Sequence, residues 1–453
     1  MSPVTRRDVL ATGAGVAVSS SVVGCISETG SSSPSIFTSF FPLYDFTTQI
    51  VGDHMPVENA VPPGEHGHGW EPRVDLLPDI VDSAAFVFLD ARGFQPWAEE
   101  AAAAIRTEYS DDMQIIDALE GIDILEYEGA HHDEYDHDPT ETASGSVAEL
   151  EVIDQRSGDI VAHFHFDHWH GAIPQIKVED ELSLGARFVD GGGHPFPLDD
   201  DSPYDFVARL DSQESNDVRI HSEDDHIVIA GTTAKTISVV FALYEDETRQ
   251  WETDPIDIEI VDERDYDGDR AHGLYDVKFF SDPVLAKQGV RTIRDGIIEL
   301  DPENEDMYRQ NAASYIDELD ALHTDFRRTL ADRSHDRVVL AGHDSFHYLG
   351  QRYGFEIHTP VGLSPDDEPS SRDIAAAIDL VEEHDIEYVL WDHFDGARVA
   401  NAIKEESATV EDTAMVSAAE NFVSEWKEEG KHDYIGQMRH INLQAFKKAL
   451  GAI

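Results

Sequence analysis

Cysteine is almost absent from this chain: Cys25 is the only one among 453 residues. A single thiol excludes an internal disulfide framework and any zinc cluster built on cysteines. Long hydrophobic runs are also missing after the first 25 residues, where nothing approaches the roughly 18 apolar residues that cross a bilayer. We therefore expect a protein without disulfides and without a membrane-spanning helix.

Basic residues are scarce, with 32 Lys and Arg against 93 Asp and Glu, which gives a formal net charge of −61. Such a charge repels nucleic acid and anionic lipid headgroups, so neither is an expected partner. It suits a halophilic protein, because high salt screens the repulsion between its carboxylates. Hydrophobic residues still make up 41% of the chain, which indicates a folded protein rather than an acidic tail.

The first 35 residues have the features of an export segment. The pair Arg6 and Arg7 precedes a weakly apolar run, which resembles a twin-arginine signal, and Val22 to Cys25 resembles a lipobox. We expect residues 1–25 to be the signal, Cys25 to carry the lipid, and residues 26–35 to form a tether. The protein would then be held by lipid on the outer face of the cell membrane. A disordered N-terminus with a chance cysteine is the alternative.

The rest of the chain divides by hydrophobic pattern. Strands alternate with helices in some stretches, whereas others show about seven short alternating strands and no helix. This predicts two Rossmann-like α/β lobes joined by a long helix, with an inserted antiparallel β-sandwich. The expected parts are the first lobe (36–129 plus 264–300), a polar loop (130–146), the sandwich (147–263), the linking helix (301–335) and the second lobe (336–453).

Three motifs lie outside the expected sandwich. They are "PPGEHGHGWEP" (62–72), "YDVKFFSDPVLAKQG" (275–289) and "VVLAGHDSFHYLGQRYG" (338–354). Together with Asp-Pro-Glu-Asn, "LSPDDEPS" and a late Tyr-x-x-x-Met-Arg, they resemble, in order, the zinc and manganese solute-binding proteins of ABC importers. The likeness covers most of 36–129 and 264–453, and we identify the chain as similar to a haloarchaeal type with a His-rich β insertion.

The resemblance implies a metal site between the lobes, with His68 as the first ligand and His343 from the second lobe as another. Loops at the carboxyl ends of strands in open α/β sheets are the usual place for a ligand. Imidazole donors favour Zn²⁺, whereas Mn²⁺ prefers more carboxylate oxygen. His66 competes with His68 for the first role, and His343 could instead be a capping or core histidine.

The chain departs from the family at two positions. Lys278 stands where the family has a second histidine ligand, and a lysine cation repels a divalent ion. His272, six residues upstream, is a possible substitute. Asp392 matches the family's acidic position and could be a ligand, an acceptor that orients an imidazole, or structural. Where manganese relatives carry a late Asp, the nearest match is Ser417.

A second group of histidines lies in the insertion. The stretch "HFHFDHWHG" resembles the ligand motif of a two-zinc hydrolase, but the helices and length that such a fold needs are missing. We expect an auxiliary metal-collecting cluster, because residues i and i+2 of a strand share a face. A histidine-tolerant acidic surface is the alternative. The cluster comprises His131, His132, His137, His163, His165, Asp167, His168 and His170.

The hypothesis that follows is a monomeric, lipid-anchored solute-binding protein that captures Zn²⁺, or alternatively Mn²⁺, and delivers it to an ABC permease and its ATPase. No bond is made or broken, so we expect no enzyme activity. Two alternatives stay open. One is a surface metal-sequestering or adhesion protein with a degenerate cleft, and the other is a metal-dependent hydrolase in the insertion.

Overall fold

The computed structural model describes residues 35–452 except 66, 68, 69, 71, 74, 75, 92, 93, 110–112, 127–145, 159, 166, 167, 191–194, 199–201, 212–216, 223–225, 246, 247, 265, 267–274, 361–368 and 370. The expected export signal with Cys25 therefore lies outside the described residues, as do His131, His132 and His137. Among the helices of the described part, none is long and apolar enough to cross a membrane.

The first lobe is built on a four-stranded parallel sheet with the order β2-β1-β3-β4. Its strand β3 is buried at every position, as expected where helices cover both faces of a parallel sheet. A proline lies at one of the first two positions of α1 and of α3, where its missing N–H breaks no hydrogen bond of the helix. The elements are β1 (Ile36–Thr38), α1 (Phe41–Val51), β2 (Val57–Asn59), α2 (Leu76–Val81), β3 (Ala85–Phe88), α3 (Pro96–Ala104), a π-helical turn (Ile105–Tyr109) and β4 (Gln114–Asp117).

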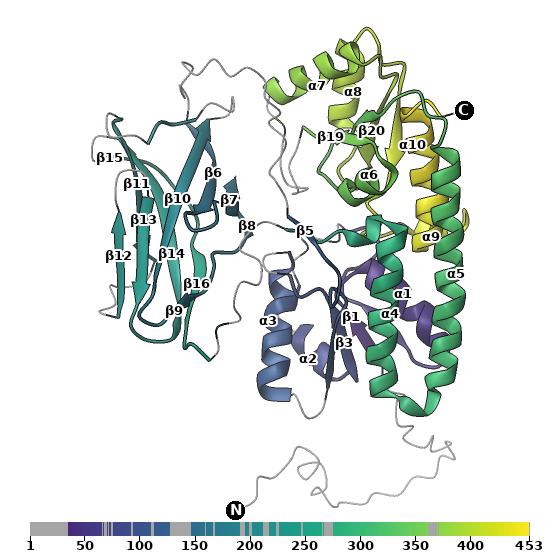
Figure 1. Cartoon of the computed structure of the whole chain (residues 1–453), viewed down its shortest axis with the longest axis horizontal. Helices are drawn as coiled ribbons and strands as arrows, with labels where there is room; N and C mark the ends of the chain where they lie inside the picture. Colours follow the sequence, from purple (N-terminus) through teal and green to yellow (C-terminus); the bar gives the residue numbers. More distant parts are fainter. Residues whose placement is uncertain are drawn as a thin grey trace, which may run out of the picture. The chain divides into compact units, whose positions relative to one another are not determined.

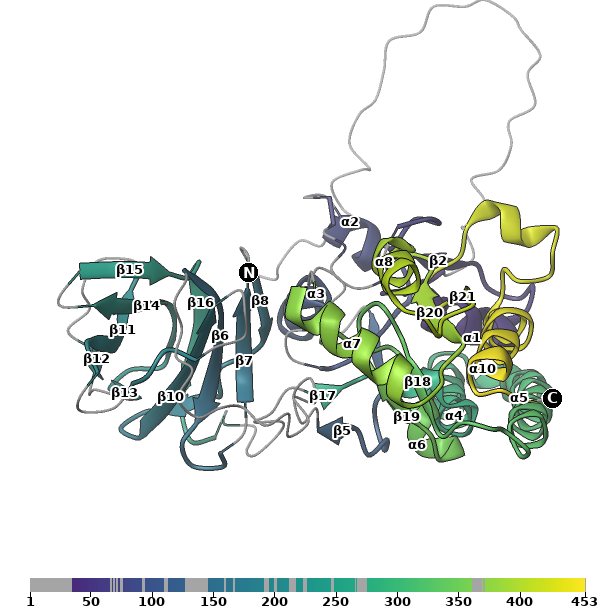
Figure 2. The ribbon, with the colours of Figure 1, turned by 90° about the horizontal axis from the view of Figure 1, so that it is seen from above.

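The chain leaves this lobe through β5 (Leu125–Glu126) and returns through β17 (Tyr275–Asp276), and these two short strands pair antiparallel. Between them lie two sheets, ordered β12-β13-β10-β6-β7-β8 and β11-β14-β16-β9, with β15 paired to β14. Figure 2 shows the strands of both sheets. Their buried residues form a hydrophobic cluster of their own. The strands are β6 (Val147–Asp154), β7 (Ile160–His165), β8 (His168–Gly171), β9 (Ile176–Lys177), β10 (Glu181–Asp190), β11 (Tyr204–Leu210), β12 (Val218–Ser222), β13 (His226–Gly231), β14 (Lys235–Glu245), β15 (Thr248–Glu252) and β16 (Ile256–Val261).

Two long helices follow, α4 (Pro283–Leu300) and α5 (Glu305–Thr329), and they pack side by side (Figure 1). In α4 the carboxylate of Asp282 caps the amide of Val284. Helix α5 begins with acidic residues and ends with arginines, which complements the helix dipole. Its buried stripe repeats every three or four residues, as an amphipathic helix requires, and comprises Tyr308, Ala312, Tyr315, Leu319, Leu322 and Phe326.

The second lobe contains two parallel strand pairs, β18 with β19 and β20 with β21, which a parallel bridge between Leu340 and Leu390 joins. Residues of this lobe, of α4 and α5 and of the first lobe share one hydrophobic cluster. The elements are β18 (Arg337–Val339), α6 (His347–Tyr353), β19 (Glu356–His358), α7 (Ser371–Glu383), β20 (Tyr388–Asp392), α8 (Arg398–Glu406), β21 (Asp412–Val416), α9 (Tyr434–Gln437), a π-helical turn (Met438–Asn442) and α10 (Leu443–Ala449).

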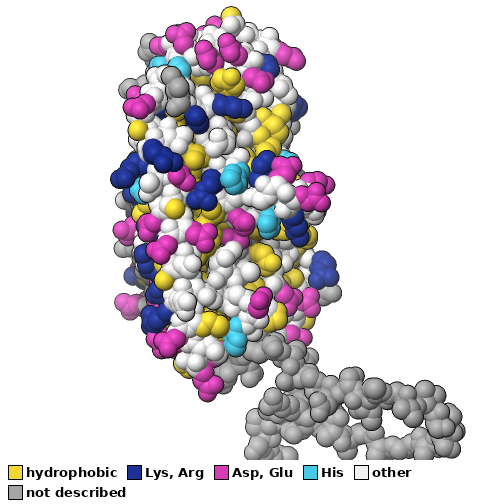
Figure 3. Space-filling view, turned by 90° about the vertical axis from the view of Figure 1, so that its right-hand side faces the viewer, with side chains coloured by type: hydrophobic (Ala, Val, Ile, Leu, Met, Phe, Trp, Pro, Cys, Tyr) yellow, Lys and Arg dark blue, Asp and Glu magenta, His cyan; other side chains and the backbone are white. Residues whose placement is uncertain are grey.

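Charged side chains of both signs are interspersed on the face that Figure 3 presents, with hydrophobic side chains scattered between them. Lysine and arginine do not gather there into one continuous basic area. This face therefore offers no electrostatic footprint for a polyanion, in agreement with the overall charge.

One buried carboxylate in this core makes stability depend on pH. Asp45 in α1 accepts a hydrogen bond of 2.8 Å from the Tyr315 hydroxyl of α5. Burial raises the pKa of Asp45 to about 7, the bonds from Tyr315, Tyr434 and Gln49 oppose this rise, and the Asp433 carboxylate adds to it. The folded state thus binds a proton that the unfolded state has lost, so this contribution to stability is present below pH 4 and is lost as the pH rises through 7.

We expect Asp45→Asn to remove that loss, because an amide keeps the hydrogen bond to Tyr315 without a charge. At pH 8 the variant should exceed the parent in free energy of unfolding by up to about 4 kcal/mol, and the difference should shrink toward pH 4. Urea unfolding at fixed salt from pH 4 to 8 measures it. The exposed Asp53→Asn is the control, and parallel pH profiles for Asp45→Asn and the parent would contradict the prediction.

Candidate metal-binding site

His343 lies just beyond β18, at the carboxyl edge of the second-lobe strands, and its side chain is fully buried. Its ring Nδ1 is 2.7 Å from Asp395 Oδ2, and the same oxygen accepts the His343 backbone amide at 3.2 Å. Its Nε2 is 2.7 Å from the Ser345 hydroxyl oxygen. A carboxylate on Nδ1 fixes the orientation of an imidazole and increases its basicity, as is usual for metal-binding histidines.

Glu420 lies in the loop after β21, and its Oε1 is 3.9 Å from His343 Nε2. The Glu420 side chain is also fully buried. The preceding residue, Ala419, has a φ of 58°, a left-handed conformation that is rare for a residue with a Cβ. Strain of this kind collects at functional sites, where the surrounding structure forces it. Loop geometry thus brings a carboxylate to the Nε2 side of the His343 ring.

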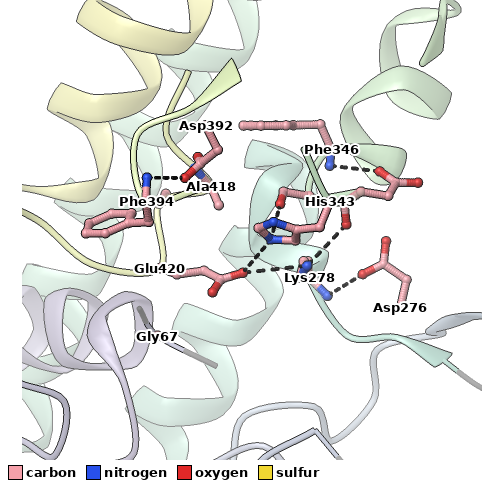
Figure 4. A network of polar contacts seen from close by, with 12 residues as sticks. Gly67, Asp276, Lys278, His343, Phe346, Asp392, Phe394, Ala418 and Glu420 are labelled. Atoms are coloured by element: carbon pink, nitrogen blue, oxygen red, sulfur yellow. Dashed lines mark hydrogen bonds and ion pairs between the residues drawn. The ribbon is translucent and has the colours of Figure 1, made fainter. Parts of the chain in front are cut away.

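Asp392 holds this loop in place. Its Oδ1 accepts the amide of Phe394 at 2.8 Å, and its Oδ2 accepts the amide of Ala418 at 2.6 Å (Figure 4). Of the three roles expected for Asp392, these contacts support the structural one. The carboxylate that orients the imidazole of His343 is that of Asp395, three residues later.

The glycine-rich turn of the first lobe lies against the same loop. Asn421 donates from Nδ2 to the carbonyls of Pro62 (2.7 Å) and Glu65 (2.8 Å). A Cβ at Gly67 would lie 2.7 Å from the Cβ of Glu420, so only glycine permits this approach. The turn that contains Gly67 therefore contacts the residue that faces His343.

Lys278 completes the cluster and is almost fully buried, with 2% of its side chain exposed. Its Nζ is 3.7 Å from Glu420 Oε1 and donates to the backbone carbonyl of Asp344 at 3.1 Å. Its backbone amide donates to Asp276 Oδ1 at 2.8 Å. Figure 4 shows the ammonium group and the His343 ring both directed toward the Glu420 carboxylate. A buried cation thus neutralises part of the local negative charge.

The charges of the cluster shift two pKa values. Burial and the Lys278 ammonium lower the pKa of His343, but the Asp395 and Glu420 carboxylates outweigh them and raise it to about 9. Burial raises the pKa of Asp276 to about 6, and the Lys278 ammonium opposes this rise. This shift favours the protonated form of His343, so a metal ion at Nε2 would compete with a proton.

The structure brings only part of the expected ligand set together. His343 is in the cluster, whereas His66, His68 and His272 lie outside the described residues. Within the described part, His, Cys, Asp and Glu side chains do not form a group of three or more that could hold a metal. The described residues that sequence reasoning missed are Glu420 and Asp395. An acidic residue soon after a parallel strand, in a loop of small and apolar neighbours, is the signal that could have indicated Glu420.

The cluster in the insertion is described only in part. Strand β7 includes His163 and His165, and β8 includes His168 and His170, while Asp167 lies outside the described residues.

Residues 36–449 match the family model described as zinc-uptake complex component A, periplasmic. The High-affinity zinc uptake system protein ZnuA of Bacillus subtilis is 30% identical over 168 residues, which are 37% of this chain and 51% of that protein. The Zinc-binding lipoprotein AdcA of Streptococcus pneumoniae is 29% identical over 188 residues, 40% of this chain and 36% of that protein. The match thus spans about half of the first relative and a smaller part of the second.

Solved structures show the same fold. The Zn(II)-bound ZnuA-like domain of AdcA from Streptococcus pneumoniae has a TM-score of 0.52 at 18% identity, with 92% of this chain and 99% of that chain covered. The laminin-binding protein Lmb of Streptococcus agalactiae, described as bifunctional with adhesin and metal transporting activity, has a TM-score of 0.53 at 16% identity, with 92% and 100% covered. At these identities the likeness shows the two-lobed α/β fold alone.

Proposed function

This chain belongs to the zinc-uptake complex component A family, whose members are metal-binding components of transport systems rather than enzymes, and we propose that it captures Zn²⁺ between its two α/β lobes. One observation carries the proposal: His343 and Glu420, two fully buried residues from different loops, face each other beside the turn that contains Gly67. A histidine and a carboxylate are two of the four donors that a closed zinc site needs.

The remaining donors would come from the first lobe. His68 and His66 flank Gly67 in sequence, and Gly67 lies against Glu420. We propose His68 as the third ligand, His66 as its competitor, and His272 as a source of a fourth donor in the position that Lys278 leaves without an imidazole. A site with two or three imidazoles and one carboxylate favours Zn²⁺ over Mn²⁺. Asp392 would support the site indirectly, by holding the loop that carries Glu420 through its hydrogen bond with the amide of Ala418.

The same proposal includes delivery of the ion to an ABC permease and its ATPase by a monomeric protein. Lipid attachment at Cys25 would keep the protein on the outer face of the membrane, and the two sheets of residues 147–261 would form an inserted β-sandwich domain. A surface adhesion or sequestration role is the second candidate, because Lys278 places a cation 3.7 Å from Glu420 and a protein of the same fold is described as having adhesin activity.

Diffraction at the zinc absorption edge, from crystals grown with ZnCl₂, tests the proposal. One ion is expected within about 2.0–2.2 Å of His343 Nε2 and a Glu420 oxygen. The same data would show which of His66, His68 and His272 completes the shell. An ion bound only elsewhere on the chain, with the His343–Asp395–Glu420 arrangement unchanged, would falsify the importer assignment and favour the sequestration role.

A further inference from the structure

Asn421 directly follows the proposed ligand Glu420, and its side chain is fully buried. Its Nδ2 donates to the backbone carbonyls of Pro62 at 2.7 Å and of Glu65 at 2.8 Å. An amide nitrogen has two N–H donors, so one turn of the first lobe engages both of them. Its Oδ1 accepts the amide of Phe422 at 2.8 Å. The carboxamide of Asn421 thus joins the second-lobe loop that carries Glu420 to the first-lobe turn.

Backbone contacts hold the same turn against the same loop. The Gly64 amide donates to the carbonyl of Phe422 at 2.9 Å. A Cβ at Gly67 would lie 2.7 Å from the Glu420 Cβ and 2.8 Å from the Glu420 carbonyl oxygen, so the two backbones are in direct contact. The turn of the first lobe therefore lies along residues 420–422, which include the proposed ligand.

Two further buried amides fix the other side of the loop. Gln437 donates from Nε2 to the carbonyl of Asn421 at 3.0 Å, and its Oε1 accepts the Ser417 hydroxyl at 2.7 Å. Asn442 accepts the Ser417 amide and donates to the Ser417 carbonyl, both at 2.8 Å. These side chains are all fully buried, and a buried polar network whose members are hydrogen-bonded is rigid. The second lobe thus holds Asn421 in one place, and the first-lobe turn is set by it.

From these contacts we propose that Asn421 is a positioning residue of the zinc site, whose carboxamide sets the distance between the first-lobe turn and Glu420. The inference rests on the proposed function, because it concerns the same site. Zinc bonds to imidazole are about 2.0–2.1 Å long, so donors from two lobes can share one ion only at a fixed separation. An amide gives the turn two donors without adding a charge beside Glu420, whereas a lysine would add a cation and an ionised aspartate could not donate.

Asn421→Leu tests this role in the full chain, since leucine has a similar size and cannot donate. Competition for ZnCl₂ with a chromophoric chelator should show binding about 10–100-fold weaker than in the parent. X-ray absorption at the zinc edge, with one equivalent of zinc per chain, should show fewer imidazole donors than in the parent, because the first-lobe donor no longer reaches the ion. A residue that only stabilised the fold would lower the unfolding temperature and leave the zinc shell unchanged.

Gly67→Ala is an independent variant, because its Cβ pushes the turn away from Glu420 and leaves Asn421 intact. It should show the same loss of affinity and of imidazole scattering, and it decides the question alone if Asn421→Leu does not fold. Asn311→Leu is the matched control. Asn311 in α5 also donates from Nδ2 to a first-lobe carbonyl, that of Ile50 near the carboxyl end of α1, at 3.0 Å. Its replacement should lower the unfolding temperature without changing the zinc affinity or the shell.

A parent-like affinity and zinc shell in Asn421→Leu, or in Gly67→Ala where the leucine variant does not fold, would overturn the proposal, as would an equal loss in Asn311→Leu. Failure of the proposed function would appear separately, as a zinc affinity that His343→Ala does not change, and that result would overturn both proposals.

Discussion

Replacing His343 with alanine is expected to weaken Zn²⁺ binding in the cleft by two to three orders of magnitude. Four-ligand zinc sites have binding free energies of roughly 10–16 kcal/mol, so one donor in four represents about 2.5–4 kcal/mol. No other described imidazole lies beside Glu420 to take its place, since His347 contacts Asp344 instead. Competition with a chromophoric zinc chelator measures the dissociation constant of each protein.

Two further variants make this result specific. His440 is exposed and is not one of the proposed zinc ligands, so His440→Ala should leave the zinc affinity unchanged. Asp395→Asn keeps a hydrogen bond to His343 Nδ1 but removes the charge that orients and polarises the ring, and it should weaken binding about 10–100-fold. If His343→Ala bound zinc as tightly as the parent, the cleft would not be the working site.

The sequence predicted His343 as a metal ligand, but it did not indicate Glu420, which the structure places beside it. A histidine directly after a buried strand and before a helix start lies at the carboxyl edge of the sheet, where ligands bind, and the family motif marks the same residue. Glu420 has no such motif. Its position depends on the left-handed turn at Ala419 and on the amide contacts of Asp392, and both are products of tertiary structure. Ser417, which the sequence matched to the late Asp of manganese relatives, is three residues before Glu420 in the same loop.

The sequence also could not show which carboxylate near the end of β20 contacts the imidazole of His343. Asp392 and Asp395 are both near the end of β20, and spacing alone favours neither as the partner of His343. In the folded chain Asp392 is used by two backbone amides, and Asp395 reaches the imidazole. The sequence did identify Lys278 as a cation at a ligand position. It could not show that the ammonium is buried within 3.7 Å of the Glu420 carboxylate.

That contact predicts opposite effects of Lys278→Gln on the empty and the zinc-bound protein. Without zinc, the Lys278 ammonium compensates the buried carboxylate of Glu420 and opposes the burial that raises the pKa of Asp276, and removal of one partner of a buried pair typically costs about 3–5 kcal/mol. With zinc, the same ammonium repels the ion, since unit charges 4 Å apart near a protein surface interact by about 4 kcal/mol. The variant should unfold at a lower temperature than the parent when empty and should bind Zn²⁺ at least about tenfold more tightly.

Thermal unfolding with and without ZnCl₂, together with the chelator competition, measures both effects in one set of proteins. Lys431→Gln, which breaks a more exposed pair with Glu429, is the charge-matched control and should change neither quantity. Lys278→His should gain more affinity than Lys278→Gln, because it adds an imidazole donor as well as removing the cation. Weaker zinc binding in Lys278→Gln would mean that the ammonium supports the site, by holding Glu420 in its binding position. Tighter binding would mean that the Lys278 ammonium repels the zinc ion in the parent protein. This repulsion would lower the affinity for zinc and make release of the ion easier.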